Sequence, residues 1–131
     1  MNPITSVAFK FFDACETGKG WQTCSQYCKP EASFSAQAEP LAEVRTLQHY
    51  TEWIKSSFQF MPDGRYELKA FGTDEERNSV CVYAVYSGTY SVTGQSMNSD
   101  YVYVMEFDGD KIRHMTKIWN AGMAMKQLGW S

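Results

Sequence analysis

The chain has 131 residues, 44% of them hydrophobic and 15% aromatic, with a net charge of −3 at pH 7. This length suits one domain with one hydrophobic core, so we expect residues 1–131 to form a single domain. No basic stripe is present, which argues against nucleic acid and anionic membranes as partners, and no apolar run reaches the roughly 18 residues of a membrane-spanning helix.

The chain contains four cysteines, at Cys15, Cys24, Cys28 and Cys81. Their spacing matches no zinc-binding or thioredoxin-like motif, and only two histidines could help to bind a metal, so we expect neither a metal nor a cofactor. Two disulfides would be possible in a secreted protein. The N-terminus lacks the basic start of a secretory signal, however, so we expect free, buried thiols in a cytoplasmic protein.

The first half of the chain predicts three helices and one short strand. The first helix begins at about Pro3 and carries apolar residues at helical spacing as far as Cys15. A short second helix covers residues 21–27, and alternating small and polar side chains predict a strand over residues 32–37. Thr46 is a suitable N-cap for the third helix, which has an apolar face of its own.

The second half of the chain predicts a sheet. Its four strands are separated by turn-rich segments and followed by a short helix. The strands cover residues 65–73, 78–90, 100–107 and 111–119, and the helix covers residues 120–128. Helices first and strands afterwards imply an α+β fold, in which the helices gather on one face of an antiparallel sheet.

Two of these strands are apolar on both faces. Residues 80–86 and 101–107 lack the alternation of a sheet that exposes one face to water. The outer face must therefore be covered too, and no predicted helix remains to cover it. We expect a homodimer packed through the outer face of the sheet, because an uncovered apolar face of this size is unusual in a monomer.

The last two strands carry recognisable residues. The run Ser99–Phe107, the turn Asp108-Gly109-Asp110 and the strand Lys111–Asn120 resemble the closing hairpin of SnoaL-like proteins, in the superfamily of nuclear transport factor two and ketosteroid isomerase. The resemblance covers nearly the whole chain, as a single SnoaL-like domain. It implies a cone-shaped fold, with a strongly bent antiparallel sheet wrapped around three N-terminal helices, a short C-terminal helix and a pocket at the open end. Members are commonly homodimers.

The resemblance allows the isomerase residues to be checked position by position. Ketosteroid isomerisation needs a carboxylate base and two hydrogen-bond donors to the oxyanion. Ala36 stands at the position of the base and Phe11 at that of the donor tyrosine, and neither side chain can perform the role. Tyr103, at the position of the donor aspartate, could still donate. Ketosteroid isomerase activity is therefore disfavoured.

SnoaL-like polyketide cyclases use an acidic residue as acid and base. Near the end of the last strand this sequence has Asn120, which can orient a substrate but cannot transfer protons at pH 7. The acids nearest the expected pocket are Asp100 and Glu106, and strand parity puts both opposite Tyr103. The resemblance thus leaves the catalytic acid unassigned.

Strand parity decides which side chains of the last strand face the pocket. One set is Arg113, Met115, Lys117 and Trp119, and the other is Ile112, His114, Thr116, Ile118 and Asn120. The resemblance favours the first set, with Lys117 near the pocket mouth. The second set would give a more polar pocket with His114 as general base. The expected ligand-binding residues are Phe11, Phe34, Trp53, Tyr101, Tyr103, Met115 and Trp119, and the candidate catalytic residues are His114, Lys117 and Asn120.

The resulting hypothesis is a homodimeric SnoaL-like protein that binds a small, largely apolar metabolite with a carbonyl or hydroxyl group. An enzyme of the lyase, isomerase or cyclase type is compatible with this hypothesis, but the sequence assigns no activity. The alternative is a non-catalytic module that binds a ligand or another protein on the same scaffold. A paired carboxylate or a buried His–Asp couple in the pocket would favour the enzyme, and a dry aromatic cavity would favour the module.

Overall fold

The computed structural model describes residues 3–129. The helices are α1 (Pro3–Glu16), α2 (Gly20–Cys24), the 3-10 turn η1 (Ser25–Tyr27), α3 (Leu47–Ser57) and α4 (Ala121–Leu128). The strands are β1 (Cys28–Ala36), β2 (Arg65–Asp74), β3 (Ser79–Thr89), β4 (Ser96–Asp108) and β5 (Lys111–Trp119). No helix within this part of the chain is long and apolar enough to cross a membrane.

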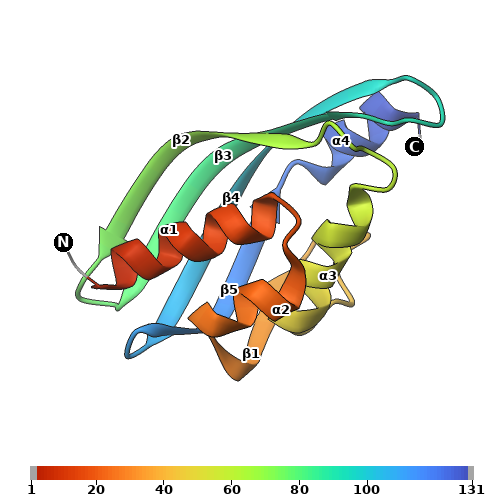
Figure 1. The fold of residues 1–131 in the computed structure, drawn as a ribbon. Coiled ribbons are helices and arrows are strands. Elements are labelled where there is room, and N and C mark those ends of the chain that lie inside the picture. Colours follow the sequence, from red (N-terminus) through yellow and green to blue (C-terminus); the bar gives the residue numbers. More distant parts are fainter. Residues whose placement is uncertain (1–2, 130–131) are drawn as a thin grey trace.

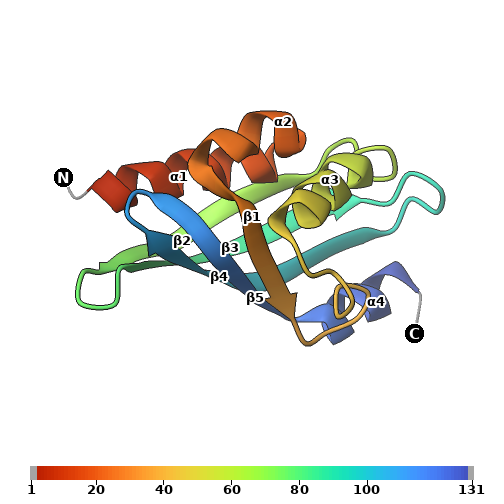
Figure 2. The same cartoon turned by 90° about the horizontal axis from the view of Figure 1, so that it is seen from below.

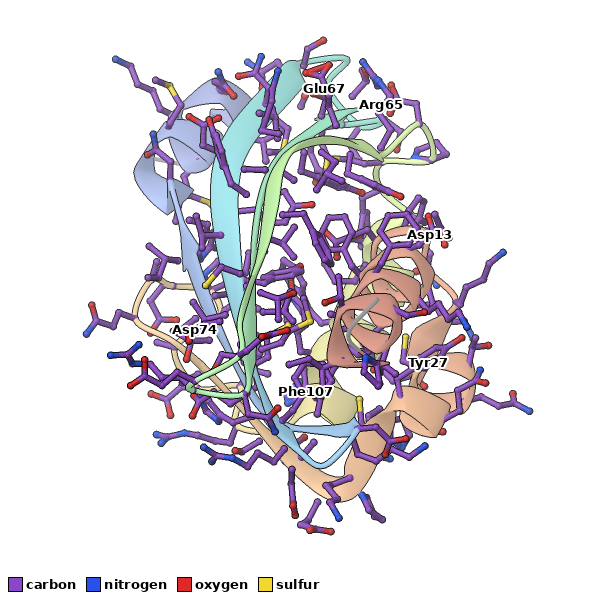
Figure 3. The ribbon with its side chains drawn as sticks, turned by 90° about the vertical axis from the view of Figure 1, so that its left-hand side faces the viewer. Asp13, Tyr27, Arg65, Glu67, Asp74 and Phe107 are labelled. Atoms are coloured by element: carbon purple, nitrogen blue, oxygen red, sulfur yellow. The ribbon has the colours of Figure 1, made fainter. Side chains whose placement is uncertain are left out.

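The five strands form one curled sheet in the order β1-β5-β4-β3-β2. Helices α1, α2 and α3 lie on its concave side, and α4 lies at the end of the sheet away from the N-terminus (Figures 1 and 2). This arrangement confirms the expected α+β fold with a bent sheet around three N-terminal helices. Side chains fill the space between sheet and helices, with Phe107 among them (Figure 3).

Strand β1 differs from the prediction in extent and direction. It begins at Cys28 rather than at Ala32, and it pairs in parallel with β5, so the sheet is not wholly antiparallel. The pairing shifts register between Cys28 and Ser33, and Pro30 lies within this irregular part. A proline is tolerated there because β1 is an edge strand, where a missing N–H costs no ladder hydrogen bond.

Two of the helix starts follow from capping side chains. The hydroxyl of Thr46 accepts a hydrogen bond from the backbone N–H of His49 at 3.1 Å, which confirms Thr46 as the N-cap of α3. The side chain of Asn120 accepts from the N–H of Met123 at 3.2 Å and starts α4. Gly129 ends α4 with a φ of 77°, in the left-handed region that glycine adopts without strain.

Strand β5 contains a bulge that strict alternation does not anticipate. Phe107 pairs with Ile112 but Glu106 pairs with His114, so Arg113 is an extra residue on β5. As a result Ile112 is buried on the concave side and Arg113 is exposed, and the expectation that placed Arg113 inward and Ile112 outward was wrong. Beyond the bulge the alternation is regular, and Met115 and Lys117 are both buried.

Candidate functional site

The cone holds an apolar pocket between α3, α4 and the ends of β4 and β5. Its volume is about 340 Å³, and we call it the outer chamber. Aromatic rings, methionines and aliphatic side chains make up most of its wall. Among the lining residues are Trp53, Phe60, Met61, Met97, Trp119 and Leu128. A chamber of this size and character suits a small, largely apolar molecule.

A smaller cavity of about 60 Å³, the inner cavity, lies against the outer chamber. The two share wall residues from α3, the segment after it, β4 and β5, which are Trp53, Ser57, Met61, Met97 and Trp119. The inner cavity adds polar and ionisable groups, namely those of Glu16, Ser99, Tyr101 and Lys117. The pocket is therefore apolar at its outer end and chemically reactive at its inner end.

Glu16 supplies a carboxyl group to the inner cavity. It is the last residue of α1, and its apolar helical face carries it under the sheet, where only 4% of its surface is exposed. Its two oxygens accept hydrogen bonds from the hydroxyls of Tyr101 at 2.6 Å and Tyr103 at 2.8 Å. Burial raises the pKa of Glu16, and the charge of Lys117 and the two tyrosine hydrogen bonds oppose that rise only in part.

The end of α1 adds to this destabilisation of the charged form. The C-terminus of a helix carries a partial negative charge, which disfavours a neighbouring carboxylate. A carboxyl group that protonates more readily than usual is suited to exchange a proton with a ligand near neutral pH.

Lys117 supplies an amine to the same cavity. It lies on β5 opposite Tyr103 of β4, and 8% of the residue is exposed. Its Nζ donates a hydrogen bond to the hydroxyl of Tyr50 at 2.9 Å. Aromatic rings surround the nitrogen, with the centroid of Trp119 at 4.5 Å, that of Tyr50 at 5.2 Å and that of Tyr101 at 5.4 Å. Burial lowers the pKa of Lys117 to about 8, although the charge of Glu16 opposes the change.

Four side chains form a directed chain of hydrogen bonds from the amine to the carboxyl group. Lys117 donates to Tyr50, and Tyr103 donates to Glu16. The hydroxyls of Tyr50 and Tyr103 contact each other. Each tyrosine has a single hydroxyl hydrogen, and that of Tyr103 points to Glu16, so Tyr50 must donate to Tyr103. The chain therefore runs Lys117 to Tyr50 to Tyr103 to Glu16 without a break.

Two further polar atoms are buried near this region. Among the described residues, the hydroxyl of Tyr86 and the indole Nε1 of Trp119 have no hydrogen-bond partner. Both residues line the inner cavity, but the Tyr86 hydroxyl lies against Gly64, so the Trp119 donor is the one available to a ligand. Buried donors are nearly always paired in native proteins, so unpaired donors at a cavity mark a place where a polar ligand atom would be stabilised.

The structure places part of the expected binding set at the pocket. Trp53, Tyr101 and Trp119 line the inner cavity, and Trp53 and Trp119 line the outer chamber as well. Lys117 was expected near the pocket mouth, with its charged end in water. That expectation was wrong, because the β5 alternation and the rings around Nζ hold the amine at the buried end.

The other expected binding residues lie behind the wall. Phe11, Tyr103 and Met115 have 0% exposure and Phe34 has 2%, and none of them lines the outer chamber or the inner cavity. Phe34 stacks on the ring of Tyr50 with centroids 4.3 Å apart. These side chains form the core that supports the site, and Tyr103 contributes through its hydroxyl.

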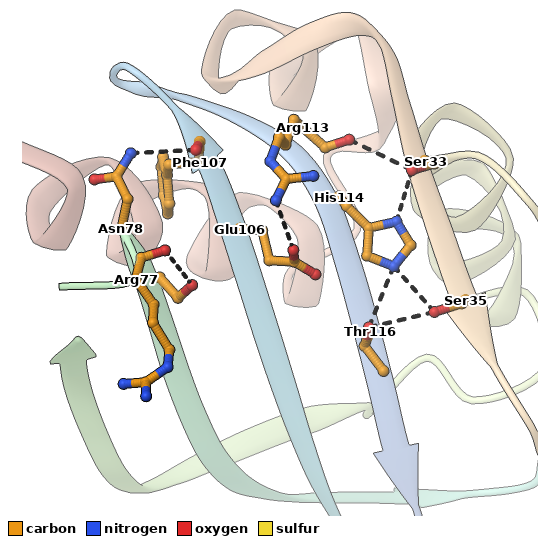
Figure 4. Close-up of polar contacts among 10 residues, drawn as sticks. Ser33, Ser35, Arg77, Asn78, Glu106, Phe107, Arg113, His114 and Thr116 are labelled. Atoms are coloured by element: carbon orange, nitrogen blue, oxygen red, sulfur yellow. Dashed lines mark hydrogen bonds and ion pairs between the residues drawn. The ribbon is translucent and has the colours of Figure 1, made fainter. Parts of the chain in front are cut away.

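His114 and Asn120 lie away from the pocket. His114 is on the outer face of the sheet, where its Nδ1 lies 2.6 Å from the hydroxyl of Ser33 and its Nε2 lies 3.0 Å from that of Ser35 (Figure 4). Asn120 is exposed and caps α4. Ile118, of the same parity as His114, is 63% exposed. The more polar arrangement of β5 is thus not the one this protein adopts.

Sequence reasoning missed Glu16 and the hydroxyl of Tyr50. Glu16 follows Phe12 by four residues and Ala8 by eight, so it continues the buried face of α1. An acidic residue on the buried face of this helix is the sequence signal that could have identified Glu16 as a candidate functional residue. Tyr50 lies on the buried, apolar face of α3, and nothing in the local pattern shows which partner its hydroxyl meets. Among residues 3–129, no group of three histidine, cysteine or acidic side chains could hold a metal ion.

Comparisons with solved structures agree with this fold. IdmH of Streptomyces antibioticus, described as a "putative polyketide cyclase", has a TM-score of 0.76 at 16% identity, with 98% of this chain and 99% of that chain covered. An NTF2-like protein of Burkholderia thailandensis has a TM-score of 0.79 at 18% identity, with 98% of each chain covered. A protein of Catenulispora acidiphila with a ketosteroid isomerase-like fold, solved with trimethylamine, has a TM-score of 0.76 at 11% identity, with 95% of this chain and 93% of that chain covered.

These identities establish the fold and not the reaction. No curated protein matches the sequence significantly. A family model described as the SnoaL-like domain matches residues 8–115, which is most of the chain and includes Glu16, Tyr50 and Tyr103. The chain therefore belongs to the SnoaL-like family.

Proposed function

We propose that this protein is an acid/base enzyme that acts on a small, largely apolar metabolite carrying a carbonyl or hydroxyl group. The ligand's apolar body occupies the outer chamber, and its oxygen reaches the inner cavity. Glu16 transfers the proton, which makes the reaction one of proton removal or return next to a carbonyl, as in isomerisation or aldol-type ring closure.

The observation that carries the proposal is the placement of Glu16. A buried carboxyl group with a raised pKa lies at the closed end of an apolar pocket, where a proton donor and acceptor is required. The unpaired indole N–H of Trp119 supports an oxygen-bearing ligand, because it would donate a hydrogen bond to the ligand's oxygen. Structural neighbours described as polyketide cyclases support the same reaction class.

The base therefore comes from α1 and not from β1. In β1 the position next to Lys117 holds Ala36, which cannot accept a proton. An acid/base group at the end of α1 approaches the inner cavity from the opposite side to β1 and β5. The reaction would use the same cone as the ketosteroid isomerases with a differently placed carboxyl group.

We also infer a cytoplasmic homodimer packed through the outer face of the sheet. That face carries half-buried valines on β3 and β4 together with Tyr83, 38% exposed, and Ile118, 63% exposed. A second copy would cover these side chains and the hydroxyl cluster of His114. Free thiols at the buried Cys15, Cys24 and Cys28 agree with a reducing compartment, and the fourth cysteine, Cys81, is exposed rather than buried as expected.

The test is proton exchange on a bound ketone. Cyclohexanone in heavy water should lose its α-protons faster with the protein than in buffer, as followed by NMR. Glu16→Gln keeps the shape but cannot accept a proton, and it should lower the protein-dependent rate by roughly 100-fold or more. Asp13→Asn is the matched control, since Asp13 is an exposed acid on the same helix.

Ligand binding is measured separately by quenching of tryptophan fluorescence, because Trp53 and Trp119 line the pocket. Binding without protein-dependent exchange in the wild type would contradict the enzyme and support the non-catalytic binding module. Equal rates for wild type and Glu16→Gln would remove Glu16 from the chemistry.

A further inference from the structure

We propose that the amine of Lys117 reacts covalently with the ligand. It condenses with an aldehyde or ketone carbon of the ligand to form an imine. This inference rests on the proposed function, because the carbonyl compound is the one that the pocket binds. It goes beyond acid/base chemistry at Glu16, since it adds a bond between the protein and the ligand.

The geometry presents the amine to a bound carbonyl. Lys117 lines the inner cavity, and within the described part of the chain it is the one primary amine in that wall. The five wall residues shared with the outer chamber make the two spaces neighbours, so a ligand with its body outside presents its head to Lys117. The inner cavity, at about 60 Å³, has room for a carbonyl group and little more.

The surroundings of Lys117 are unlike those of a structural lysine. Buried lysines usually form an ion pair with a carboxylate or extend their ammonium group to water. None of the ion pairs found between residues 3 and 129 includes Lys117, whose nitrogen contacts a tyrosine hydroxyl and aromatic faces instead. Such an environment favours the neutral amine, which is the form that attacks a carbonyl.

The hydrogen-bond chain gives the ammonium proton a destination. A shift of one proton along each link, from Lys117 through Tyr50 and Tyr103, protonates Glu16 and leaves a neutral amine. The charges of the buried pair disappear together, so the cavity gains no net charge. Burial makes this proton shift easier, because it lowers the pKa of the lysine and raises that of the glutamate.

The covalent step balances without any further reactant. The lone pair of Nζ forms a bond to the carbonyl carbon as the C=O π bond opens, and the carbonyl oxygen takes a proton that Glu16 returns through the tyrosine hydroxyls. The nitrogen gives one of its two protons to the Glu16 carboxylate by the same route, which leaves a neutral carbinolamine. Glu16 then protonates the hydroxyl group, which leaves as water while the nitrogen lone pair forms the C=N bond, and the last N–H proton returns to Glu16. The overall change is an amine plus a carbonyl compound giving an imine plus water. Glu16 and Lys117 thereby act on the same ligand from one cavity.

The experiment is reductive trapping with small apolar carbonyl compounds. The full chain at pH 7.5 is incubated with hexanal, benzaldehyde or cyclohexanone and with sodium cyanoborohydride, which reduces an imine to a stable amine. Peptide mass mapping then locates the adduct. A lysine with a pKa of about 8 has on the order of 100 times more free amine at this pH than an ordinary lysine.

We expect Lys117 to be labelled roughly 10 to 100 times faster than the exposed lysines Lys10 and Lys126 of the same molecules. The Lys117 rate should rise up to about pH 8 and then level off. Lys117→Met should remove the fast adduct and leave the slow ones. Because the comparison is internal to the wild type, it does not depend on the folding of any variant.

Fluorescence quenching in the same samples separates the two proposals. If the probes bind and Lys117 is labelled no faster than Lys10, the covalent role is overturned while the binding site stands. If none of the probes binds, the proposed function and this inference fall together. Labelling of Lys117 that persists in Glu16→Gln but at a lower rate supports the proton route through the tyrosines.

Discussion

Replacing Lys117 with methionine should stabilise the folded protein at neutral pH. Methionine has a similar length and carries no charge, so it fits the same aromatic surroundings. Lowering the pKa from its ordinary 10.5 to about 8 means that folding with a charged Lys117 costs about 3 kcal/mol. The variant removes this cost but also loses the hydrogen bond to Tyr50, which destabilises it by about 1 kcal/mol. The net stabilisation is about 2 kcal/mol.

The pH dependence identifies the cause. The folded-state pKa of this lysine is depressed, so below pH 8 the amine is charged in both states and the full penalty is present. Between pH 8 and 10.5 the folded state loses its proton first, and wild-type stability rises relative to the variant. The advantage of Lys117→Met should therefore shrink by about 2 kcal/mol or more between pH 7 and pH 10.

Urea unfolding at pH 7, 8, 9 and 10 measures both effects, with the free energy taken from the midpoint and slope. The matched control is Lys10→Met, which changes an exposed lysine on α1 and should shift stability by less than about 0.5 kcal/mol at any pH. A Lys117→Met variant that is less stable than wild type at pH 7, or whose advantage does not change with pH, would refute the reasoning.

Three further predictions concern the interface, the chamber and the support of the site. Ile118→Asp places a charge on the exposed outer face of the sheet and should turn a dimer into a monomer in light scattering, with the fold unchanged by circular dichroism. Met125→Trp enlarges a wall residue of the outer chamber and should weaken binding of cyclohexanone at least roughly 10-fold by calorimetry, with little loss of stability. Phe34→Ala removes the ring stacked on Tyr50 and should cost about 3–5 kcal/mol in urea unfolding.

The architecture could be predicted from sequence because each element carries a strong local pattern. The helical spacing in α1, the cap at Thr46 and the turn-rich segments that separate β2, β3, β4 and β5 all agree with the structure. The parallel edge strand β1 was predicted too short. Its bulge and its proline break the alternation on which strand recognition depends.

The site was predictable only in part, because its chemistry depends on contacts between distant residues. The parity of β5 beyond the bulge followed from the resemblance and brought Lys117 and Trp119 inward. The bulge at Arg113 is a single extra residue and leaves no sign in the composition of the strand. The partners of Glu16 lie 85 and 87 positions away, so no local pattern shows that its carboxyl group is buried and hydrogen-bonded.

The packing of α4 separates the shape of the ligand chamber from the positions of the reactive groups, two properties that often interfere with each other in enzymes. Met97, Ala124 and Leu128 form a small cluster of their own, apart from the main core that holds Glu16 and Lys117 in place. The same three residues line the outer chamber. Substitutions in α4 can therefore change the size and shape of accepted molecules while the reactive groups keep their positions. In the course of evolution such a protein could exchange one metabolite for another by altering a single peripheral helix.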